Sequence, residues 1–210
     1  MKVLAIAAHP DDIELCCFGT LAKYKKLGHE ISYALTTSGN QGSNVMKSRE
    51  EIATVREKEA AQAAALLGVE PVFLRFDDEC LLNNAVSRRS VINCIRQANP
   101  DVILTHPPFD KSTDHGTTGT IVSEVLLSLK GKNLESDVPP ITKTPSLFFF
   151  DTYMGVDFQP EIYVDITEEF PLKKEAFLKH ISQREWMGNF LGGDFAHSME
   201  ILAEFRGLQS

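Results

Sequence analysis

The sequence predicts an α/β fold built on a largely parallel sheet, and two observations carry this prediction. The first two-thirds of the 210-residue chain alternates short apolar runs with helix-like segments, which is the pattern of β-α-β units. Polar residues also follow the end of each apolar run, where ligands bind in such sheets. The length suits one domain with a full core, so we expect residues 1–210 to form a single domain.

Each strand is predicted from a short, mostly apolar run. Residues 2–8 are a continuous apolar run, as expected of a strand buried on both faces. Further strands are expected at residues 29–37, 69–76, 101–105, 146–153 and 161–166.

Helices are predicted from longer stretches with helix-forming composition and recognisable stop signals. They are expected at residues 13–27, 47–67, 86–98, 117–129, 168–187 and 196–205. Gly28 and Gly68 end the first two, and Asn99-Pro100 ends the third. Residues 130–145 are polar and contain prolines, which indicates a surface excursion.

The polar segments that follow the first four strands are expected to meet. Right-handed crossovers place the carboxyl ends of parallel strands at one edge of the sheet. Ligands bind at that edge in open α/β folds. The segments are residues 9–12, 38–40, 77–78 and 106–115, and we expect them to line one cleft.

Composition excludes several classes of protein. The net charge of −8 argues against a nucleic-acid surface, which would be basic. No apolar stretch approaches the roughly 20 residues of a membrane helix, and the apolar N-terminus lacks a signal-peptide cleavage site. The four cysteines have neither zinc-finger nor disulfide-framework spacing, which favours reduced thiols in a cytoplasmic protein.

The segment after the first strand carries the chemistry. It reads His9-Pro10-Asp11-Asp12 where a dinucleotide-binding protein would have a glycine-rich loop, and its two carboxylates would repel phosphate. An imidazole and a carboxylate three residues apart can reach one metal ion, and His106 and His115 follow the fourth strand. Two histidines, one aspartate and an open position suit catalytic Zn²⁺, although Fe²⁺ or Mn²⁺ would also accept these donors.

The same segment resembles a known family signature. Residues 8–14, Ala-His-Pro-Asp-Asp-Ile-Glu, are similar to the A-H-P-D-D-x-E motif of the PIG-L/LmbE-like deacetylases. The resemblance continues through Arg56-x-x-Glu59-Ala60, Asp114-His115, Tyr163-Val164-Asp165-Ile166 and His180-Ile181-Ser182-Gln183. It implies an LmbE-like, Rossmann-like three-layer sandwich that hydrolyses N-acetyl groups, typically on N-acetylglucosamine conjugates.

The resemblance also assigns roles to individual residues. The zinc ligands would be His9, Asp12 and His115, and Asp11 would be the general base. Many members read H-x-D-H where this chain has Ser112-Thr113-Asp114-His115. Ser112 thus replaces a histidine that helps to polarise the substrate carbonyl, which leaves the metal site intact but changes the group that stabilises the oxyanion.

Several further site candidates have an ordinary structural alternative. Glu14 either orients a ligand or is a first-turn helix glutamate, and Asp114 is either a partner of a histidine or an N-cap. Arg56 either binds substrate or forms a solvated i,i+4 pair. His106 is a pocket candidate that could equally be a strand-end histidine bonded to the backbone. Asp78, beside Asp77, is expected to form a turn or to bind a sugar hydroxyl.

These inferences lead to one expected function and two rivals. We expect a metal-dependent hydrolase that removes an N-acyl group, by zinc-activated water, from a small amino-sugar conjugate. Nucleic-acid and membrane partners are not expected, and a homo-oligomer is left open. The rivals are a zinc-dependent hydratase on the same scaffold and a non-catalytic sugar- or metal-binding module.

Overall fold

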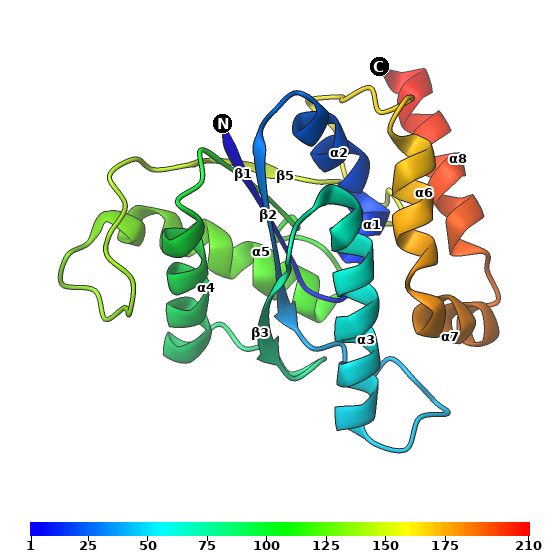
Figure 1. The fold of residues 1–210 in the computed structure, drawn as a ribbon, viewed down its shortest axis with the longest axis horizontal. Helices are drawn as coiled ribbons and strands as arrows, with labels where there is room; N and C mark the ends of the chain where they lie inside the picture. Colours follow the sequence, from blue (N-terminus) through cyan, green and yellow to red (C-terminus); the bar gives the residue numbers. More distant parts are fainter.

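Five parallel strands form one sheet in the order β3-β2-β1-β4-β5, which confirms the α/β fold (Figure 1). The computed structural model describes the backbone of residues 1–210 and every side chain except those of Phe190 and Leu191. The strands are β1 (Lys2–Ala7), β2 (Glu30–Thr37), β3 (Val72–Phe76), β4 (Val102–Thr105) and β5 (Ser146–Phe149).

Helices cover both faces of the sheet (Figure 1). One face carries α1 (Asp12–Cys16), α2 (Phe18–Lys26), α3 (Arg49–Ala64) and α6 (Phe170–Leu178). The other carries α4 (Ala85–Ala98), α5 (Thr113–Val125) and the 3-10 turn η2 (Leu126–Lys130). Two more helices follow: α8 (Phe195–Gln209) packs against α6, and α7 (Ile181–Leu191) packs against α3 and α8. A short 3-10 turn, η1 (Ala65–Leu67), extends α3.

The central strand β1 explains why its sequence is apolar throughout. Val3 and Ala5 face the core under α1, α2 and α3, whereas Leu4 and Ile6 face the core under α4 and α5. All four side chains are buried, because a central strand of a doubly covered sheet has no solvent face.

Three expectations about elements are wrong. Residues 161–166 form no strand; the Lys23 ammonium donates to the Asp165 carbonyl and Ile166 packs on Gly19, so this segment is fastened along α2 instead of the sheet. The helix expected at 13–27 breaks at Cys17, whose φ of −134° is not helical. The helix expected at 168–187 is interrupted between α6 and α7.

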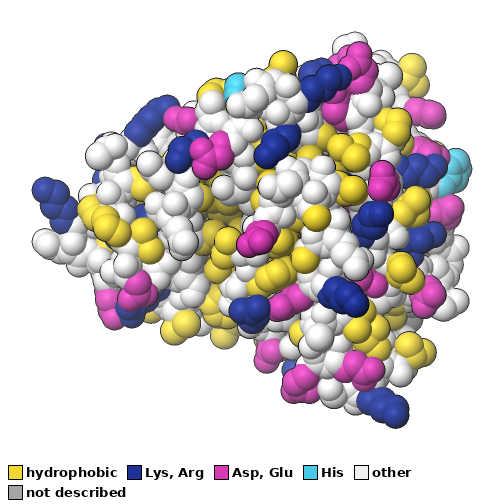
Figure 2. Space-filling view, viewed as in Figure 1, with side chains coloured by type: hydrophobic (Ala, Val, Ile, Leu, Met, Phe, Trp, Pro, Cys, Tyr) yellow, Lys and Arg dark blue, Asp and Glu magenta, His cyan; other side chains and the backbone are white. Residues whose placement is uncertain are grey.

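On the face shown in Figure 2, acidic and basic side chains are interspersed without a continuous basic area. None of the described helices has the length and apolar character needed to cross a membrane.

Candidate functional site

The carboxyl ends of the strands bring the polar segments together, as expected for a parallel sheet. The turn between β1 and α1 carries His9 and Asp11, Asp12 begins α1, and the first turn of α5 carries His115. The segments after β2 and β3 are joined by a hydrogen bond from Asn40 Nδ2 to Asp77 Oδ1 of 2.8 Å.

Three side chains present ligand atoms to a common point. His9 Nδ1 lies 3.2 Å from His115 Nε2 and 3.3 Å from Asp12 Oδ2, and His115 Nε2 lies 3.2 Å from Asp12 Oδ1. Ligand atoms of the three residues all lie within 4.8 Å of one another. Two imidazole nitrogens and a carboxylate are the donor set of a catalytic zinc site, so these residues fit a divalent metal.

Carboxylates hold the far side of each histidine ring. His9 Nε2 lies 2.9 Å from Asp78 Oδ1 and 3.2 Å from Asp114 Oδ2, and His115 Nδ1 lies 3.2 Å from Asp110 Oδ2. Such contacts fix the orientation of a metal-binding imidazole and increase its basicity. Asp114 is therefore a partner of a histidine and not the N-cap of α5, a position occupied by Ser112.

The pKa of each of these three residues depends on the charges of its neighbours. Burial disfavours charged His9, but Asp12, Asp114 and Asp78 outweigh it and raise the pKa of His9 well above its usual value. Burial likewise opposes charge on His115, while Asp12 and Asp110 raise its pKa to about 9. Although burial acts in the other direction, the histidines hold the pKa of Asp12 well below its usual range. This excess of carboxylates is what a bound cation would neutralise.

Asp11 occupies a different environment from its neighbour Asp12. Its φ of 127° is rare for a residue with a side chain, and it turns the Asp11 carboxylate towards Arg56, whose Nη2 lies 3.4 Å from Asp11 Oδ2. Burial raises the pKa of Asp11 to about 6, and the Arg56 charge offsets part of that effect.

Arg56 is buried, which excludes the solvated-pair alternative. Its Nη1 donates to the Gly39 carbonyl and its Nη2 to the Pro10 carbonyl, both at 2.7 Å. It thereby ties the loop after β2 to the turn that carries Asp11. Gly39 makes the close approach feasible, because its φ is 60° and a Cβ there would lie 2.3 Å from Arg56 Nη1.

Glu14 and His106 both lie behind the face formed by His9, Asp12 and His115. Glu14 is fully buried, accepts a hydrogen bond of 2.8 Å from the Tyr33 hydroxyl and lies 3.2 Å from His180 Nε2. His106 is also fully buried; its ring stacks on His115 at 4.0 Å, and its Nε2 lies 3.1 Å from the Ala8 amide nitrogen. Burial lowers the pKa of His106 to about 4, so it is neutral. This position supports Asp12 and His115 and is out of reach of a substrate.

Three residues near His9, Asp12 and His115 make contacts that the sequence did not predict. Asp78 was expected to form a turn or to bind a sugar hydroxyl, Asp110 belongs to no motif, and Tyr153 follows Asp151 and Thr152 after the end of β5. The half-buried Tyr153 ring meets His115 edge-on at 6.2 Å and contacts Phe195 on its other side, also at 6.2 Å. Its hydroxyl makes no hydrogen bond within the described part of the chain. Only the general rule that parallel strands end at one edge could have directed attention to Tyr153.

The chain is similar in sequence to known proteins. Residues 4–126 match the family model described as PIG-L, GlcNAc-PI de-N-acetylase. The chain is 27% identical over 192 residues to a probable N-acetyl-alpha-D-glucosaminyl L-malate deacetylase 2 of Bacillus anthracis, covering 86% of this chain and 80% of that one.

Solved structures share the fold. N,N'-diacetylchitobiose deacetylase from Pyrococcus horikoshii is 28% identical, with a TM-score of 0.77 over 87% of this chain and 70% of that one. The 4-carboxy-2-hydroxymuconate hydratase GalB from Pseudomonas putida gives a TM-score of 0.84 over 100% of this chain and 87% of that one; at 19% identity, this likeness shows the fold alone.

Proposed function

This chain belongs to the PIG-L family of de-N-acetylases, and we propose that it removes the acetyl group from an N-acetylated amino-sugar conjugate in a metal-dependent reaction. We further propose that residues 1–210 make up one such catalytic domain. The observation that carries the proposal is the set of three converging ligands, His9, Asp12 and His115, on the same turn as a separate buried carboxylate, Asp11.

Zinc is the ion that we propose for this site, while Fe²⁺ and Mn²⁺ would satisfy the same donors. When bound, zinc polarises an amide carbonyl and lowers the pKa of water towards about 7. The carboxylates of Asp78, Asp114 and Asp110 contact the two histidine rings, which leaves His9 Nδ1 and His115 Nε2 as the nitrogens that would hold the ion.

Asp11 is the group that we propose to move the proton. A pKa of about 6 leaves its carboxylate ionised at neutral pH, yet more basic than an exposed aspartate. It can therefore take a proton from the attacking water and return it to the departing amine. Arg56 lies 3.4 Å from this carboxylate and is itself fixed by its hydrogen bonds to the Pro10 and Gly39 carbonyls.

The developing negative charge on the carbonyl oxygen needs a donor, since Ser112 stands where many members have histidine. His106 does not fit this role because it is fully buried behind His115. We propose that the Tyr153 hydroxyl is the donor. It belongs to a half-buried residue against His115 and has no other hydrogen-bond partner among the described residues.

The proposal is tested by measuring products. Zinc-loaded protein is incubated with N-acetylglucosamine and its conjugates, and released acetate and free amine are quantified together, with Asp11→Asn as the control. Equal amounts of acetate and amine, absent from the control, are the expected result. A protein with full zinc occupancy that releases neither product contradicts the proposal, and addition of water to an unsaturated acid instead would establish the hydratase.

A further inference from the structure

The segment 151–158, which follows β5 and carries Tyr153, is neither helix nor strand. Two of its residues have left-handed backbone conformations, Gly155 with a φ of 66° and Asp157 with a φ of 60°. Such a conformation is unfavourable for a residue with a side chain, such as Asp157. Within the segment, the Gly155 amide donates to the Thr152 carbonyl at 2.9 Å. That turn leaves the two ends of the segment to be fixed by contacts from elsewhere in the protein.

A single arginine of α8 binds both ends of this segment. Arg206 Nε and Nη2 donate to the Asp151 carboxylate at 2.6 and 3.2 Å. Nη2 also donates to the Gly155 and Phe158 carbonyls, at 3.1 and 3.3 Å. An arginine that binds a carboxylate through two nitrogens has a defined geometry, because its guanidinium is planar and rigid. Residues 151–158 therefore form a loop that is closed by one side chain.

The contact between Arg206 and Asp151 is better shielded from water than a second ionic contact of the same loop. The side chains of Arg206 and Asp151 are 14% and 19% exposed. Lys111 Nζ lies 2.6 Å from Asp157 Oδ2, but these two side chains are 79% and 55% exposed. Solvent screening leaves exposed ion pairs with little effect on stability. Arg206 is therefore the main support of the loop.

Tyr153 depends on this support for the position of its hydroxyl. Its ring lies between those of His115 and Phe195, with a centroid distance of 6.2 Å to both. These are contacts of the ring, and the hydroxyl has no hydrogen-bond partner among the described residues. The backbone of residues 151–158 therefore determines where the hydroxyl lies. A displacement of about 1 Å near a reacting group can cost about 10²-fold in rate.

We propose that Arg206 is a positioning residue, which holds the Tyr153 hydroxyl in place for the reaction by closing the loop of residues 151–158. The inference rests on the proposed deacetylase function and on the Tyr153 hydroxyl as its donor to the oxyanion. Within the described part of the chain, the hydrogen bonds and ion pairs of Arg206 reach none of the three proposed metal ligands. Loss of Arg206 is thus expected to lower the rate and to leave the metal bound.

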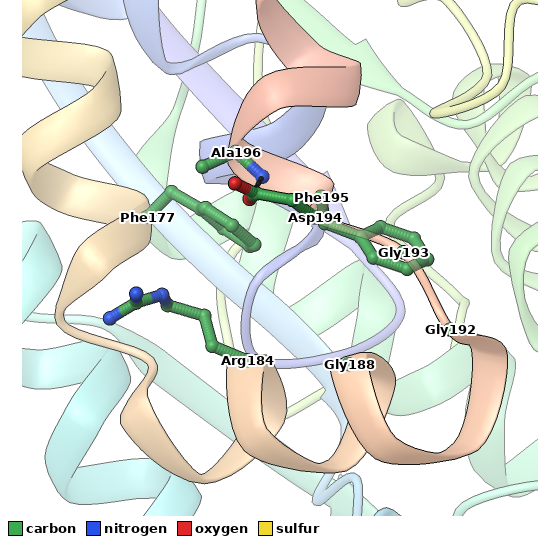
Figure 3. Close-up of a pocket in the computed structure, with 8 residues that line it drawn as sticks. All are labelled: Phe177, Arg184, Gly188, Gly192, Gly193, Asp194, Phe195 and Ala196. Atoms are coloured by element: carbon green, nitrogen blue, oxygen red, sulfur yellow. Dashed lines mark hydrogen bonds between the residues drawn. The ribbon is translucent and has the colours of Figure 1, made fainter.

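Steady-state kinetics of zinc-loaded Arg206→Gln measures this effect. We expect kcat to fall by about tenfold to 10²-fold, with KM and metal content preserved. Arg184→Gln is the matched control, because Arg184 lies on α7, is exposed and forms no ion pair among the described residues. Figure 3 shows its side chain extending beside Phe177 at a pocket between α7 and α8. The control should keep the kcat of the unmodified protein.

A double-mutant cycle distinguishes positioning from a general loss of stability. If Arg206 acts through Tyr153, Arg206→Gln should cost no further rate in the Tyr153→Phe protein, because the hydroxyl is already absent. An equal loss of kcat in both backgrounds, or no loss in either, overturns the proposal. Asp151→Asn removes the other partner of the ion pair and is expected to show the same dependence on Tyr153. It takes the place of Arg206→Gln in the cycle if that protein does not fold.

The position of Tyr153 can also be followed without turnover. The chain has four tyrosines, so protein labelled with fluorotyrosine gives four fluorine NMR resonances, and Tyr153→Phe identifies the one that belongs to Tyr153. In Arg206→Gln this resonance should move towards that of the unfolded protein, whereas in Arg184→Gln it should stay in place. A moved resonance in a protein that releases no acetate from any substrate would defeat the deacetylase alone. A resonance that does not move overturns the positioning role of Arg206 whatever the hydrolytic activity.

Discussion

Replacing Asp11 with asparagine is expected to stabilise the metal-free protein while removing most of its activity. Burial raises the pKa of Asp11 from 3.8 to about 6, so keeping this carboxylate ionised costs free energy. Each pKa unit corresponds to about 1.4 kcal/mol, which gives a gain of up to about 3 kcal/mol for the neutral isostere at pH 7.5.

The sign of the pH dependence follows from the direction of the shift. With its folded-state pKa raised, Asp11 binds its proton more tightly in the folded than in the unfolded protein. The resulting stability is fully present below pH 3.8 and is lost as the pH rises through about 6. The advantage of Asp11→Asn should therefore be small at pH 4 and should grow to its full value near pH 7.

Urea unfolding of both metal-free proteins at pH 4.5 and pH 7.5 measures this difference, and turnover of the zinc-loaded forms measures the activity. We expect the rate to fall by about 10²–10⁴, the usual effect of losing a general base, with metal content retained. Asp12→Asn is the control, because the histidines hold the pKa of Asp12 low and its loss should reduce both stability and metal content. An Asp11→Asn protein that is less stable at pH 7.5, or that loses its metal while Asp12→Asn keeps it, would refute this reasoning.

Four further outcomes are expected. Elemental analysis should find about one divalent ion per chain and less in His115→Ala, since three protein ligands are the minimum of a catalytic site; unchanged content would mean that His106 or another group is the third ligand. Zinc affinity, measured by competition with a chelator, should fall by at least about tenfold per pH unit below pH 9, where protons occupy His115; an affinity independent of pH between 6 and 8 would contradict this. Tyr153→Phe should lower kcat by about 10²–10³ with metal content and KM preserved, and an unchanged kcat would remove its hydroxyl from the reaction. Gly39→Ala should reduce the free energy of unfolding in urea by at least about 1 kcal/mol, because alanine disfavours a φ of 60° and its Cβ would displace Arg56; a neutral effect would show that the loop adapts.

The elements that could be predicted from the sequence are those determined locally. The apolar run of β1 and the stop at Gly68, whose φ is 65°, depend on neighbouring residues and on burial of both faces. The segment 161–166 is rich in β-branched and aromatic residues like a strand, but a strand also needs a partner with free hydrogen-bonding groups. That requirement is tertiary, and the segment packs on α2 instead.

The site likewise combines residues that a local motif identifies with residues that only tertiary contacts bring into it. The His9-Pro10-Asp11-Asp12 turn and His115 were identifiable from a motif because their roles are tied to short spacings. Asp78 and Asp110 act through contacts between distant segments, and an aspartate after a strand forms a turn far more often than it orients a histidine. For Arg56 the sequence left a substrate-binding role and a solvated pair as alternatives, because its position in the helix does not reveal the loop that buries it.

Asp11, the proposed ligands His9, Asp12 and His115, and the carboxylates around them all lie within residues 4–126, whereas α7 and α8 follow that range. The proposed catalytic groups, apart from Tyr153, are thus encoded in one stretch of the gene and the last two helices in another. A combinatorial library restricted to Arg184, Gly188 and residues 192–195 should accordingly retain hydrolysis in a large fraction of its clones.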